Sequence, residues 1–582
     1  MNVFDVLSIV VALLGVTLIV YIFGFQQSLE NRLVQLLMLK IVFAYYMLNY
    51  FVRFLYTFEP GNFFRQTRFE WILLLLLVIE ALSSSIFNFP LGKNLVGALG
   101  LGENTHVYEL LLLFFLLALL IFQIAKASTF LDKITIEPSS LFILSFAILI
   151  LAGAGLLMLP EMTTDRMGTP FLSALFTSTS ASCVTGLIVV DTATYFSLKG
   201  KIIIIFLMQL GGLSIISFAT FFASFFTKGL GVKHTTLMAD YYSSDSILTA
   251  KSLLRQIVVL SFIIEGAGVI ILFIQFGNYV EFKSFWSQLF CAVFHSVSAF
   301  NNAGFSTFTN NLYEECIRQS YDLHLTIATL IFFGSLGFST IQDVFSYSSI
   351  KERSKLKWKK IKLASAISLY SSFWLIGLGA LGFWFFENHH TLEGLSNVGK
   401  VVSSIFQAVT PRTAGFNSVD YSLLSNTTII LTIFLMFIGA SSGSTGGGIK
   451  TSTFTLLFVS AWATIRGKKN IELMHYSIAW DLLNKAFTIL LFSGTFCLAS
   501  WLALVYFEPH IDPIKLIFEE VSAFCTVGLS TGITAGLSTV SKTVLIVSMF
   551  VGRVGTLTLA FALSARTDST RYKYPTAHFM VG

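Results

Sequence analysis

Residues 523–532 read AFCTVGLSTG, a polar stretch centred on a glycine in an otherwise apolar region. Three earlier stretches have the same character: SASCVTGLIV at 180–189, SAFNNAGFST at 298–307 and TPRTAGFNSV at 410–419. Their central glycines are Gly186, Gly304, Gly415 and Gly528, at separations of 118, 111 and 113 residues. Four similar stretches at nearly even spacing indicate one element repeated four times.

The composition predicts an integral membrane protein. The chain has 582 residues, of which 55% are hydrophobic and 12% charged, and its mean hydropathy is +0.78. Soluble domains carry about 25% charged residues. Runs such as WILLLLLVIEAL at 71–82 and SLFILSFAILILAGAGLLML at 140–159 have the apolarity of spanning helices.

Charge and cysteine content exclude other classes. The five cysteines are scattered and odd in number, so they predict neither a disulfide framework nor a metal site. The formal net charge of +6 is compatible with nucleic-acid binding. However, the basic residues lie in loops between apolar spans, a pattern that reports membrane topology. We therefore expect no nucleic-acid partner.

The fold class that we expect is an all-α integral membrane protein. Four spans, near 5–24, 35–57, 70–88 and 106–125, form an N-terminal accessory unit over residues 1–135, and the first of them is expected to be retained. Four repeats follow, each made of a spanning helix, a re-entrant loop and a second spanning helix. Their boundaries are 136–235, 236–350, 351–470 and 471–582, and the last includes a cytoplasmic C-terminus.

Each glycine stretch sits between two characteristic neighbours. Before it comes a short amphipathic segment, as in FLSALFTSTSAS and FWSQLFCAVFHSVSAF, which is too short to span a bilayer. After it comes a second apolar run that contains glycine. The offsets from the central glycines to Gly211, Gly334, Gly439 and Gly552 are 25, 30, 24 and 24 residues.

Basic residues predict the orientation of the repeats. Lys and Arg are concentrated after each second span, whereas the connections around the glycine stretches contain fewer of them. We therefore expect both termini in the cytoplasm and the glycine loops to enter from outside. The basic positions are Lys228 and Lys233, residues 351–362 and 466–470, and Arg566, Arg571 and Lys573.

The glycine stretches predict an ion path. Non-helical backbone at membrane depth is tolerated only where it is buried in protein or lines water. Glycine permits the left-handed conformation that turns successive carbonyls the same way, and rings of carbonyl oxygens replace the hydration shell of a cation. Four such loops in pseudo-fourfold arrangement would surround one pore. The alternative is that the glycines only allow close helix packing.

The sequence also resembles a known family. The motifs CVTGL, NNAGF, RTAGF and CTVGL, the four-repeat layout and the ending RYKYPTAHFMVG resemble the bacterial potassium-uptake subunits KtrB and TrkH, within the Trk, Ktr and HKT superfamily. The resemblance covers residues 139–582. It implies a selectivity filter of Val184, Thr185, Gly186, Asn302, Ala303, Gly304, Thr413, Ala414, Gly415, Thr526, Val527 and Gly528. A glycine at position 186 favours potassium over sodium in this family.

The stretch GASSGSTGGGIKTST interrupts the second span of the third repeat from Gly439 to about Thr453. So many Gly and Ser residues do not sustain a helix in lipid, although a kinked helix is an alternative. Its partial match to a nucleotide P-loop fails, because Ile449 separates Gly448 from Lys450. The resemblance makes this stretch a gate, with Gly439, Gly443, Gly446, Gly447, Gly448 and Lys450.

Arg553 is the sharpest charge in a predicted span, and charges at that depth are costly and usually functional. The resemblance implies an electrostatic barrier below the filter. The alternative is a structural salt bridge to a buried carboxylate such as Glu265 or Asp343. His295 and Gln407, on two of the short segments, are expected to support the loops. Glu519 and Glu520 are expected to hydrogen-bond the fourth loop or to attract cations.

We expect a channel-like potassium uptake protein rather than an enzyme, because no catalytic constellation is present. A sodium- or proton-coupled symporter is the alternative, and inverted repeats would favour it. These repeats run parallel, which favours a pore. No cofactor is expected in the chain, and K+ is the transported ion.

The resemblance further implies a homodimer in the cytoplasmic (inner) membrane, in contact with lipid. It also implies a separate cytosolic RCK-type regulatory subunit that binds nucleotide. Residues 351–362 and the C-terminal tail are candidates for the contact with that subunit.

Overall fold

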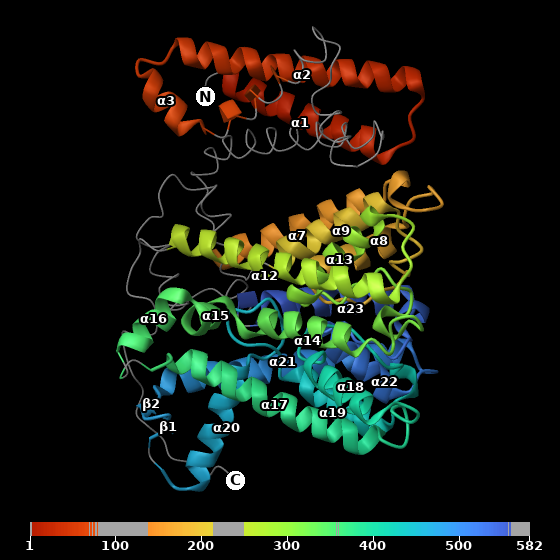
Figure 1. Ribbon diagram of the computed structural model, residues 1–582, viewed down its shortest axis with the longest axis vertical. Coiled ribbons are helices and arrows are strands. Elements are labelled where there is room, and N and C mark those ends of the chain that lie inside the picture. Colours follow the sequence, from red (N-terminus) through yellow and green to blue (C-terminus); the bar gives the residue numbers. More distant parts are fainter. Residues whose placement is uncertain are drawn as a thin grey trace.

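The computed structural model describes residues 3–79, 138–212 and 250–559, except for residues 69, 73, 76, 77, 357, 359, 469 and 557. Regular structure in this part of the chain is helical apart from one antiparallel hairpin, β1 (Glu472–Leu473) and β2 (Tyr476–Ser477). The longer helices run roughly side by side in Figure 1.

Four helical units follow one another, each with a long helix, a short helix, a loop and a further helix. Unit 1 contains α7 (Pro138–Leu157), α8 (Phe171–Ser182) and α9 (Leu198–Gly212), and unit 2 contains α12 (Ala250–Tyr279), α13 (Phe285–Phe300) and α14 (Tyr321–Leu336). Unit 3 contains α17 (Leu363–Glu387), α18 (Asn397–Val409) and α19 (Asn426–Phe437), and unit 4 contains α21 (Trp480–Phe507), α22 (Pro513–Phe524) and α23 (Thr539–Val554).

The four short helices agree closely with the segments predicted from sequence. Helices α8 and α13 have the predicted bounds; α18 begins four residues before the predicted segment VVSSIFQAVT (401–410) and ends one residue before its end, and α22 begins two residues before the predicted segment KLIFEEVSAF (515–524). Local signals fix their starts: Ser284 and Ser396 accept N-terminal N–H groups, and Asp512 caps α22 just before a proline at its first position.

Hydrophobic clusters join each unit to the next and close the set into a ring. Each cluster takes buried side chains mainly from two neighbouring units, so the core is divided among the four interfaces. Representative pairs are Phe196 and Phe305 between units 1 and 2, Phe276 and Phe406 between units 2 and 3, Phe383 and Phe518 between units 3 and 4, and Phe176 and Leu516 between units 4 and 1.

Several helices have the dimensions of membrane spans. In the described residues, four are long and apolar enough to cross a bilayer, namely Leu37–Leu55, Gln256–Tyr279, Leu363–Glu387 and Trp480–Phe507. A fifth is obtained if α14 and α15 (Phe338–Phe345) count as one span, bent by 103°. The chain is therefore a membrane protein of largely helical structure.

Three of the glycines identified by their spacing lie against the ends of short helices. A Cβ added at Gly211, Gly334 or Gly552 would lie 2.0, 1.9 or 1.6 Å from the carbonyl oxygen of Ser182, Phe300 or Phe524, respectively. Each of these carbonyls belongs to the last residue of the short helix in the same unit. The second helix thus touches the end of the short helix backbone to backbone, which only glycine permits.

Within the described residues, the second helices of units 2, 3 and 4 are all broken, whereas the sequence predicted one break. The predicted break in unit 3 spans Ile438 to Lys450, and α20 (Thr451–Ile465) begins before the expected end at Thr453. The further breaks lie in unit 2 at Gly337, whose φ is +85°, and in unit 4 at Gly555, whose φ is +88°. A Cβ at Gly337 would lie 2.7 Å from the Ser442 carbonyl, so this break makes room for the loop of unit 3.

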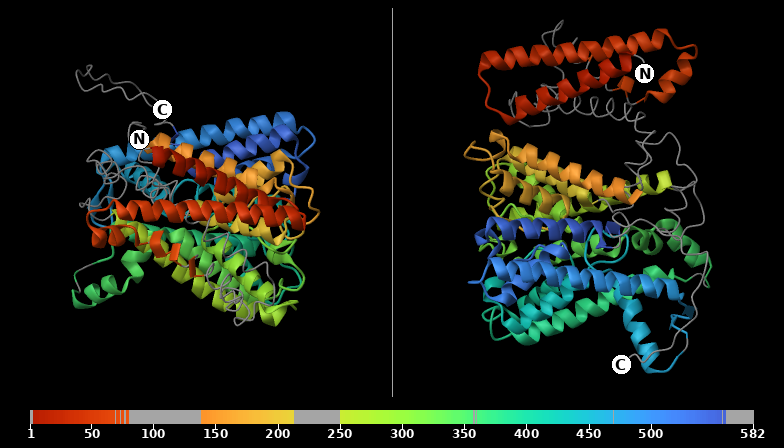
Figure 2. Two further views of the ribbon diagram at one scale, coloured as in Figure 1. Left: turned by 90° about the horizontal axis from the view of Figure 1, so that it is seen from above. Right: turned by 180° about the vertical axis from the view of Figure 1, so that it is seen from behind.

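The N-terminal residues form a separate hairpin of α1 (Val3–Gly24) and α2 (Leu29–Leu55), followed by α3 (Pro60–Gln66). It runs alongside the other helices at one edge of the molecule (Figures 1 and 2). Of the four predicted N-terminal spans, the first two correspond to α1 and α2. The span near 106–125 lies outside the described residues, and so does the end of the span near 70–88.

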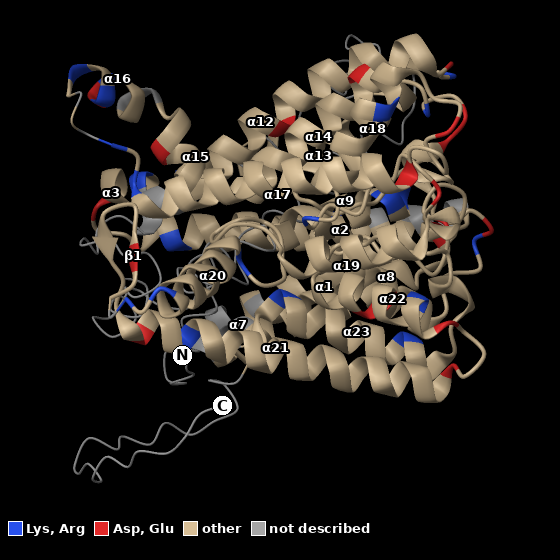
Figure 3. Ribbon diagram, turned by 90° about the horizontal axis from the view of Figure 1, so that it is seen from below, with Lys and Arg blue, Asp and Glu red and all other residues tan. Residues whose placement is uncertain are grey.

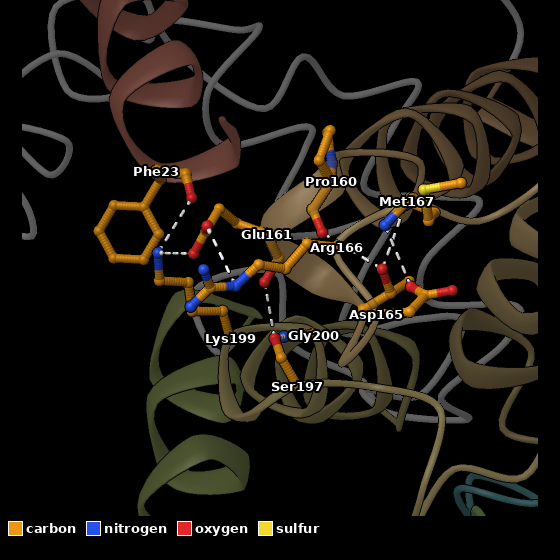
Figure 4. Close-up of polar contacts among 11 residues, drawn as sticks. Phe23, Pro160, Glu161, Asp165, Arg166, Met167, Ser197, Lys199 and Gly200 are labelled. Carbon is orange, nitrogen blue, oxygen red and sulfur yellow. Dashed lines mark hydrogen bonds and ion pairs between the residues drawn. The ribbon is translucent and has the colours of Figure 1, made fainter. Parts of the chain in front are cut away.

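One polar contact fastens the hairpin to unit 1 (Figure 4). The Lys199 ammonium donates to the Phe23 carbonyl at 3.3 Å and lies 5.2 Å from the centroid of the Phe23 ring. The same ammonium pairs with the Glu161 carboxylate at 3.0 Å. The hairpin is therefore held by a cation that both elements share.

Basic residues lie at both ends of the helices (Figure 3). Helix α16 (Tyr347–Lys355) and the β1–β2 hairpin lie at one end, where blue segments mark α16. The short helices α8 and α22 approach the opposite end in Figure 1. The predicted basic positions Lys228, Lys233, Arg566, Arg571 and Lys573 lie outside the described residues.

The close contact at Gly552 predicts that replacing glycine by alanine will have different effects on stability at two positions of unit 4. We expect Gly552→Ala to lower the melting temperature of the purified protein, because overpacking a fixed backbone contact costs about 1–3 kcal/mol. Gly494→Ala is the matched control, since a Cβ on Gly494 in α21 would meet nothing within 4 Å. That change should leave the melting temperature equal or higher, because alanine favours helix. Equal effects would contradict the packing role.

Candidate functional site

The four glycine segments share one backbone conformation. Each central glycine has a positive φ, and so does the residue two positions before it. The φ values are +57° and +93° at Val184 and Gly186, +60° and +71° at Asn302 and Gly304, +94° and +72° at Thr413 and Gly415, and +50° and +89° at Thr526 and Gly528. All twelve predicted filter residues are buried.

The segments meet in a closed ring. A Cβ added at Gly186 would lie 2.5 Å from the Ala303 carbonyl oxygen, and one at Gly304 would lie 2.7 Å from that of Ala414. A Cβ at Gly415 would lie 2.5 Å from the Val527 oxygen, and one at Gly528 would lie 1.9 Å from the Thr185 oxygen. Each central glycine thus faces the carbonyl of the residue before the next glycine, and the fourth segment returns to the first.

The left-handed residues before the glycines carry strain. Val184, Thr413 and Thr526 are β-branched, and a positive φ is unusual for such residues. Backbone in a sparsely populated region persists only where its surroundings determine it, and it clusters at functional sites. The sequence signalled the glycine of each segment but not this second left-handed position.

Each segment continues directly from the end of its short helix. In units 1, 2 and 4 the N–H before the central glycine donates to a carbonyl five residues back: Thr185 to Ser180 at 2.7 Å, Ala303 to Ser298 at 2.7 Å and Val527 to Ser522 at 2.8 Å. Unit 3 differs, since Ala414 donates to Thr410 four residues back at 2.9 Å. The negative end of each helix dipole therefore lies next to its glycine segment.

Buried polar side chains hold the segments from behind. His295 Nε2 lies 3.0 Å from the Ser306 hydroxyl, and Gln407 Nε2 donates to the Ser418 hydroxyl at 3.1 Å. Both residues brace the chain after a glycine, which agrees with the supporting role predicted for them.

The two carboxylates of α22 are also hydrogen-bonded inside the protein. Glu519 accepts from the Thr531 N–H at 2.8 Å and from the Thr534 hydroxyl at 2.7 Å, while Glu520 accepts from the Ser548 hydroxyl at 2.7 Å. Both residues are fully buried. Glu519 therefore anchors the stretch that follows the fourth segment, and Glu520 ties α22 to α23.

The break in unit 3 forms a closed loop, residues 438–450, which we call the intramembrane loop. Its ends pair where the Gly439 N–H donates to the Ile449 carbonyl at 2.9 Å. Its middle is bonded to unit 2, where the Phe338 N–H donates to the Gly443 carbonyl at 3.3 Å. The Thr445 N–H donates in turn to the Gly334 carbonyl at 3.3 Å. The kinked-helix alternative is therefore wrong.

The intramembrane loop lies against three of the four glycine segments. The Asn302 side-chain amide hydrogen-bonds the Thr445 hydroxyl at 3.0 Å. A Cβ added at Gly446 or Gly447 would lie 2.2 or 2.3 Å from the hydroxyl of Thr413 or Thr526. These contacts use the left-handed residue of segments 2, 3 and 4, so the loop covers the same side of each segment.

The other predicted loop residues shape the loop itself. A Cβ added at Gly439 would lie 2.3 Å from the Gly447 carbonyl, and Gly443 and Gly448 have positive φ values of +75° and +69°. The Lys450 ammonium donates to the Gly446 carbonyl at 2.5 Å. Lys450 thus closes the loop from its own end.

Arg553 binds the intramembrane loop rather than a carboxylate. Its guanidinium donates to the carbonyls of Thr445 and Gly211, and 3% of the residue is exposed. The proposed partners are engaged elsewhere: Glu265 accepts from Gln209 and Asn301, and Asp343 accepts from the Lys362 N–H. Within the described part of the chain, the salt-bridge alternative is therefore wrong.

Arg412 is a buried charge that sequence analysis missed. It lies three residues before Gly415, is 1% exposed and donates to the Ser372 hydroxyl at 3.0 Å. The arginine in TPRTAGF was visible in the sequence, but an arginine in a polar loop gives no signal of burial. The positive charge of Arg412 is therefore buried next to the third glycine segment.

Comparisons with known proteins identify relatives over most of the chain. The family described as TrkH, cation transport protein, matches residues 132–573. The Ktr system potassium uptake protein B of Vibrio alginolyticus is 35% identical over 78% of this chain and 96% of its own length. That of Bacillus subtilis is 37% identical over 76% of this chain and 97% of its own length.

A solved structure supports the fold. The potassium transporter TrkH from Vibrio parahaemolyticus superposes with a TM-score of 0.59 at 20% identity, over 85% of this chain and 98% of that one. Together, the helices and the family match define a membrane transport protein rather than an enzyme. The chain belongs to the TrkH family of cation transport proteins.

Proposed function

We propose that the chain takes up potassium ions across the cytoplasmic membrane through a channel-like pore. The observation that carries the proposal is the ring in which each central glycine faces a carbonyl of the next segment. Stacked carbonyl oxygens replace the water around a monovalent cation. The two relatives described above are potassium uptake proteins, which supports potassium as the transported ion.

In this proposal the twelve residues of the ring form the selectivity filter. The four units surround it as pseudo-fourfold repeats, and the ends of the four short helices add partial negative charge toward the axis. An inside-negative potential then drives cations inward with about 2.3 kcal/mol per charge per 100 mV. No cofactor of the chain is needed for this step.

The intramembrane loop serves as the gate. It lies against three of the four segments, and a cation leaving the filter meets both the loop and the charge of Arg553. Since Arg553 donates to Thr445, the same guanidinium holds the loop in place. Opening the pore then requires the loop to leave its contacts with Asn302, Thr413 and Thr526.

The same proposal includes the membrane in which the chain lies, its oligomeric state and its partner subunit. The chain lies in the inner membrane as a homodimer, with both termini in the cytoplasm, and a cytosolic nucleotide-binding subunit controls the gate. The cytoplasmic end is the one that carries α16 and the β1–β2 hairpin.

Ion uptake into liposomes containing the purified protein tests the function directly. Potassium or rubidium entry under a negative-inside potential, with sodium and lithium excluded and no sodium gradient, is the expected result. Uptake that requires a sodium or proton gradient would instead support the coupled symporter.

Gly304→Ser tests the filter. We expect potassium uptake or its selectivity over sodium to fall about tenfold, because a residue with a Cβ pays about 1–2 kcal/mol for a left-handed φ and this Cβ would press on the Ala414 carbonyl. Gly266→Ser in α12 is the control, since a Cβ there meets nothing within 4 Å. Unchanged selectivity in a folded Gly304→Ser protein would exclude the filter role.

Arg553→Gln tests the gate. We expect faster potassium uptake, because glutamine removes the charge and weakens the hold on the Thr445 and Gly211 carbonyls. Removal of residues 440–448 should act in the same direction. A folded, monodisperse Arg553→Gln protein with the native rate would refute the barrier.

Cys316 tests the orientation. It is the only exposed cysteine, whereas Cys183, Cys291, Cys497 and Cys525 are buried, and it lies between the second glycine segment and α14. A membrane-impermeant maleimide added to intact cells should label it, and Cys316→Ser should abolish labelling. Labelling only after cell lysis would reverse the proposed orientation.

A further inference from the structure

A strongly basic segment runs from the second half of α16 through the connection to α17. Residues 351–362 read KERSKLKWKKIK and contain seven Lys or Arg against one Glu, a formal charge of 7 − 1 = +6. The whole chain also has a net charge of +6. Residues 351–362 therefore carry as much net positive charge as the entire protein.

The connection lies directly at the end of a candidate membrane span. Helix α17 begins at Leu363, immediately after Lys362, and extends 25 residues to Glu387. Helix α16, which precedes the connection, projects from the helices at the end away from α22 (Figure 3). The lysines are thus at the level where a span leaves the bilayer and headgroups begin.

Exposed apolar side chains alternate with these lysines. Trp358 is 76% exposed, Ile361 40% and Leu356 38%. Lys355, Lys360 and Lys362 are exposed as well. Tryptophan is enriched at the membrane–water interface, and basic side chains next to apolar ones are typical of segments that lie in the headgroup region.

One carboxylate holds both ends of the connection. Asp343 in α15 lies 3.8 Å from the Arg353 guanidinium in α16 and accepts a hydrogen bond from the Lys362 N–H at 2.9 Å. Arg353 also donates to the Val344 carbonyl at 2.8 Å. Asp343 therefore holds the residues on both sides of the connection in place.

We propose that the exposed residues Lys355, Leu356, Trp358, Lys360, Ile361 and Lys362 form a docking surface for the headgroups of anionic phospholipids in the cytoplasmic leaflet. The proposal rests on the membrane orientation of the proposed function. Charge complementarity selects an anionic partner, and each lysine near an anionic surface contributes a favourable electrostatic term. The position beside α17 and the exposed Trp358 and Ile361 favour a lipid over the cytosolic subunit expected for this segment, because a lipid surface accepts both charge and apolar side chains.

Spin-labelled lipids measure this preference without any transport. The full chain is reconstituted in phosphatidylcholine vesicles with a trace of spin-labelled phosphatidylglycerol or phosphatidylcholine. Electron paramagnetic resonance then gives the protein-associated fraction of each. We expect phosphatidylglycerol to associate more strongly, and high salt to reduce the difference, since charges are screened beyond about 3 Å at 1 M ionic strength.

A triple variant, Lys355→Gln, Lys360→Gln and Lys362→Gln, should lose about threefold or more of the preference. The control carries Lys283→Gln, Lys468→Gln and Lys485→Gln, three exposed lysines elsewhere that give the same charge change, and should keep it. An unchanged preference in the first variant would overturn the proposal. If the first variant keeps its lipid preference but no longer binds a cytosolic subunit, the segment is a protein contact, and the proposal is overturned as well. The lipid measurement requires no transport, so a negative result in the uptake assay would refute the proposed function without deciding the lipid preference.

Discussion

The structure depends on four backbone segments that share one small space without room for a side chain. At each central glycine a Cβ would lie 1.9–2.7 Å from a carbonyl oxygen of the next segment. Such contacts are directional, because each segment presents a glycine to one neighbour and a carbonyl to the other. This rule places four similar segments in a ring and orients their carbonyls alike.

The helices around the ring are arranged to hold those segments still. Three of the four short helices end against a glycine in the second helix of their unit, and buried polar groups such as Glu519 and His295 brace the chain beyond. Buried polar groups without partners are costly, so the hydrogen bonds fix a single arrangement. The β-branched left-handed residues become tolerable because the surroundings leave the backbone no alternative.

The sequence predicted those parts of the site that have a local signature. Helix α13 has the predicted bounds because Ser284 and an apolar face specify it locally, and the glycine spacing located the ring segments. The partners of Arg553 were not predictable, because both are backbone carbonyls, which any residue supplies. The break at Gly337 was missed because one glycine in an apolar run resembles a packing glycine, and only the loop pressing from unit 3 distinguishes it.

The intramembrane loop distinguishes unit 3 from the other units, and it connects unit 3 directly to unit 2. The loop belongs to unit 3, but its middle is hydrogen-bonded to the broken helix of unit 2 through Phe338. That residue begins α15, and Asp343 in α15 holds the basic connection before α17. The loop and the connection before α17 are thus attached to one eight-residue helix, which begins directly after Gly337. The Asp343 side chain and the Phe338 N–H thus link the connection to the loop by a path that does not include the ring segments.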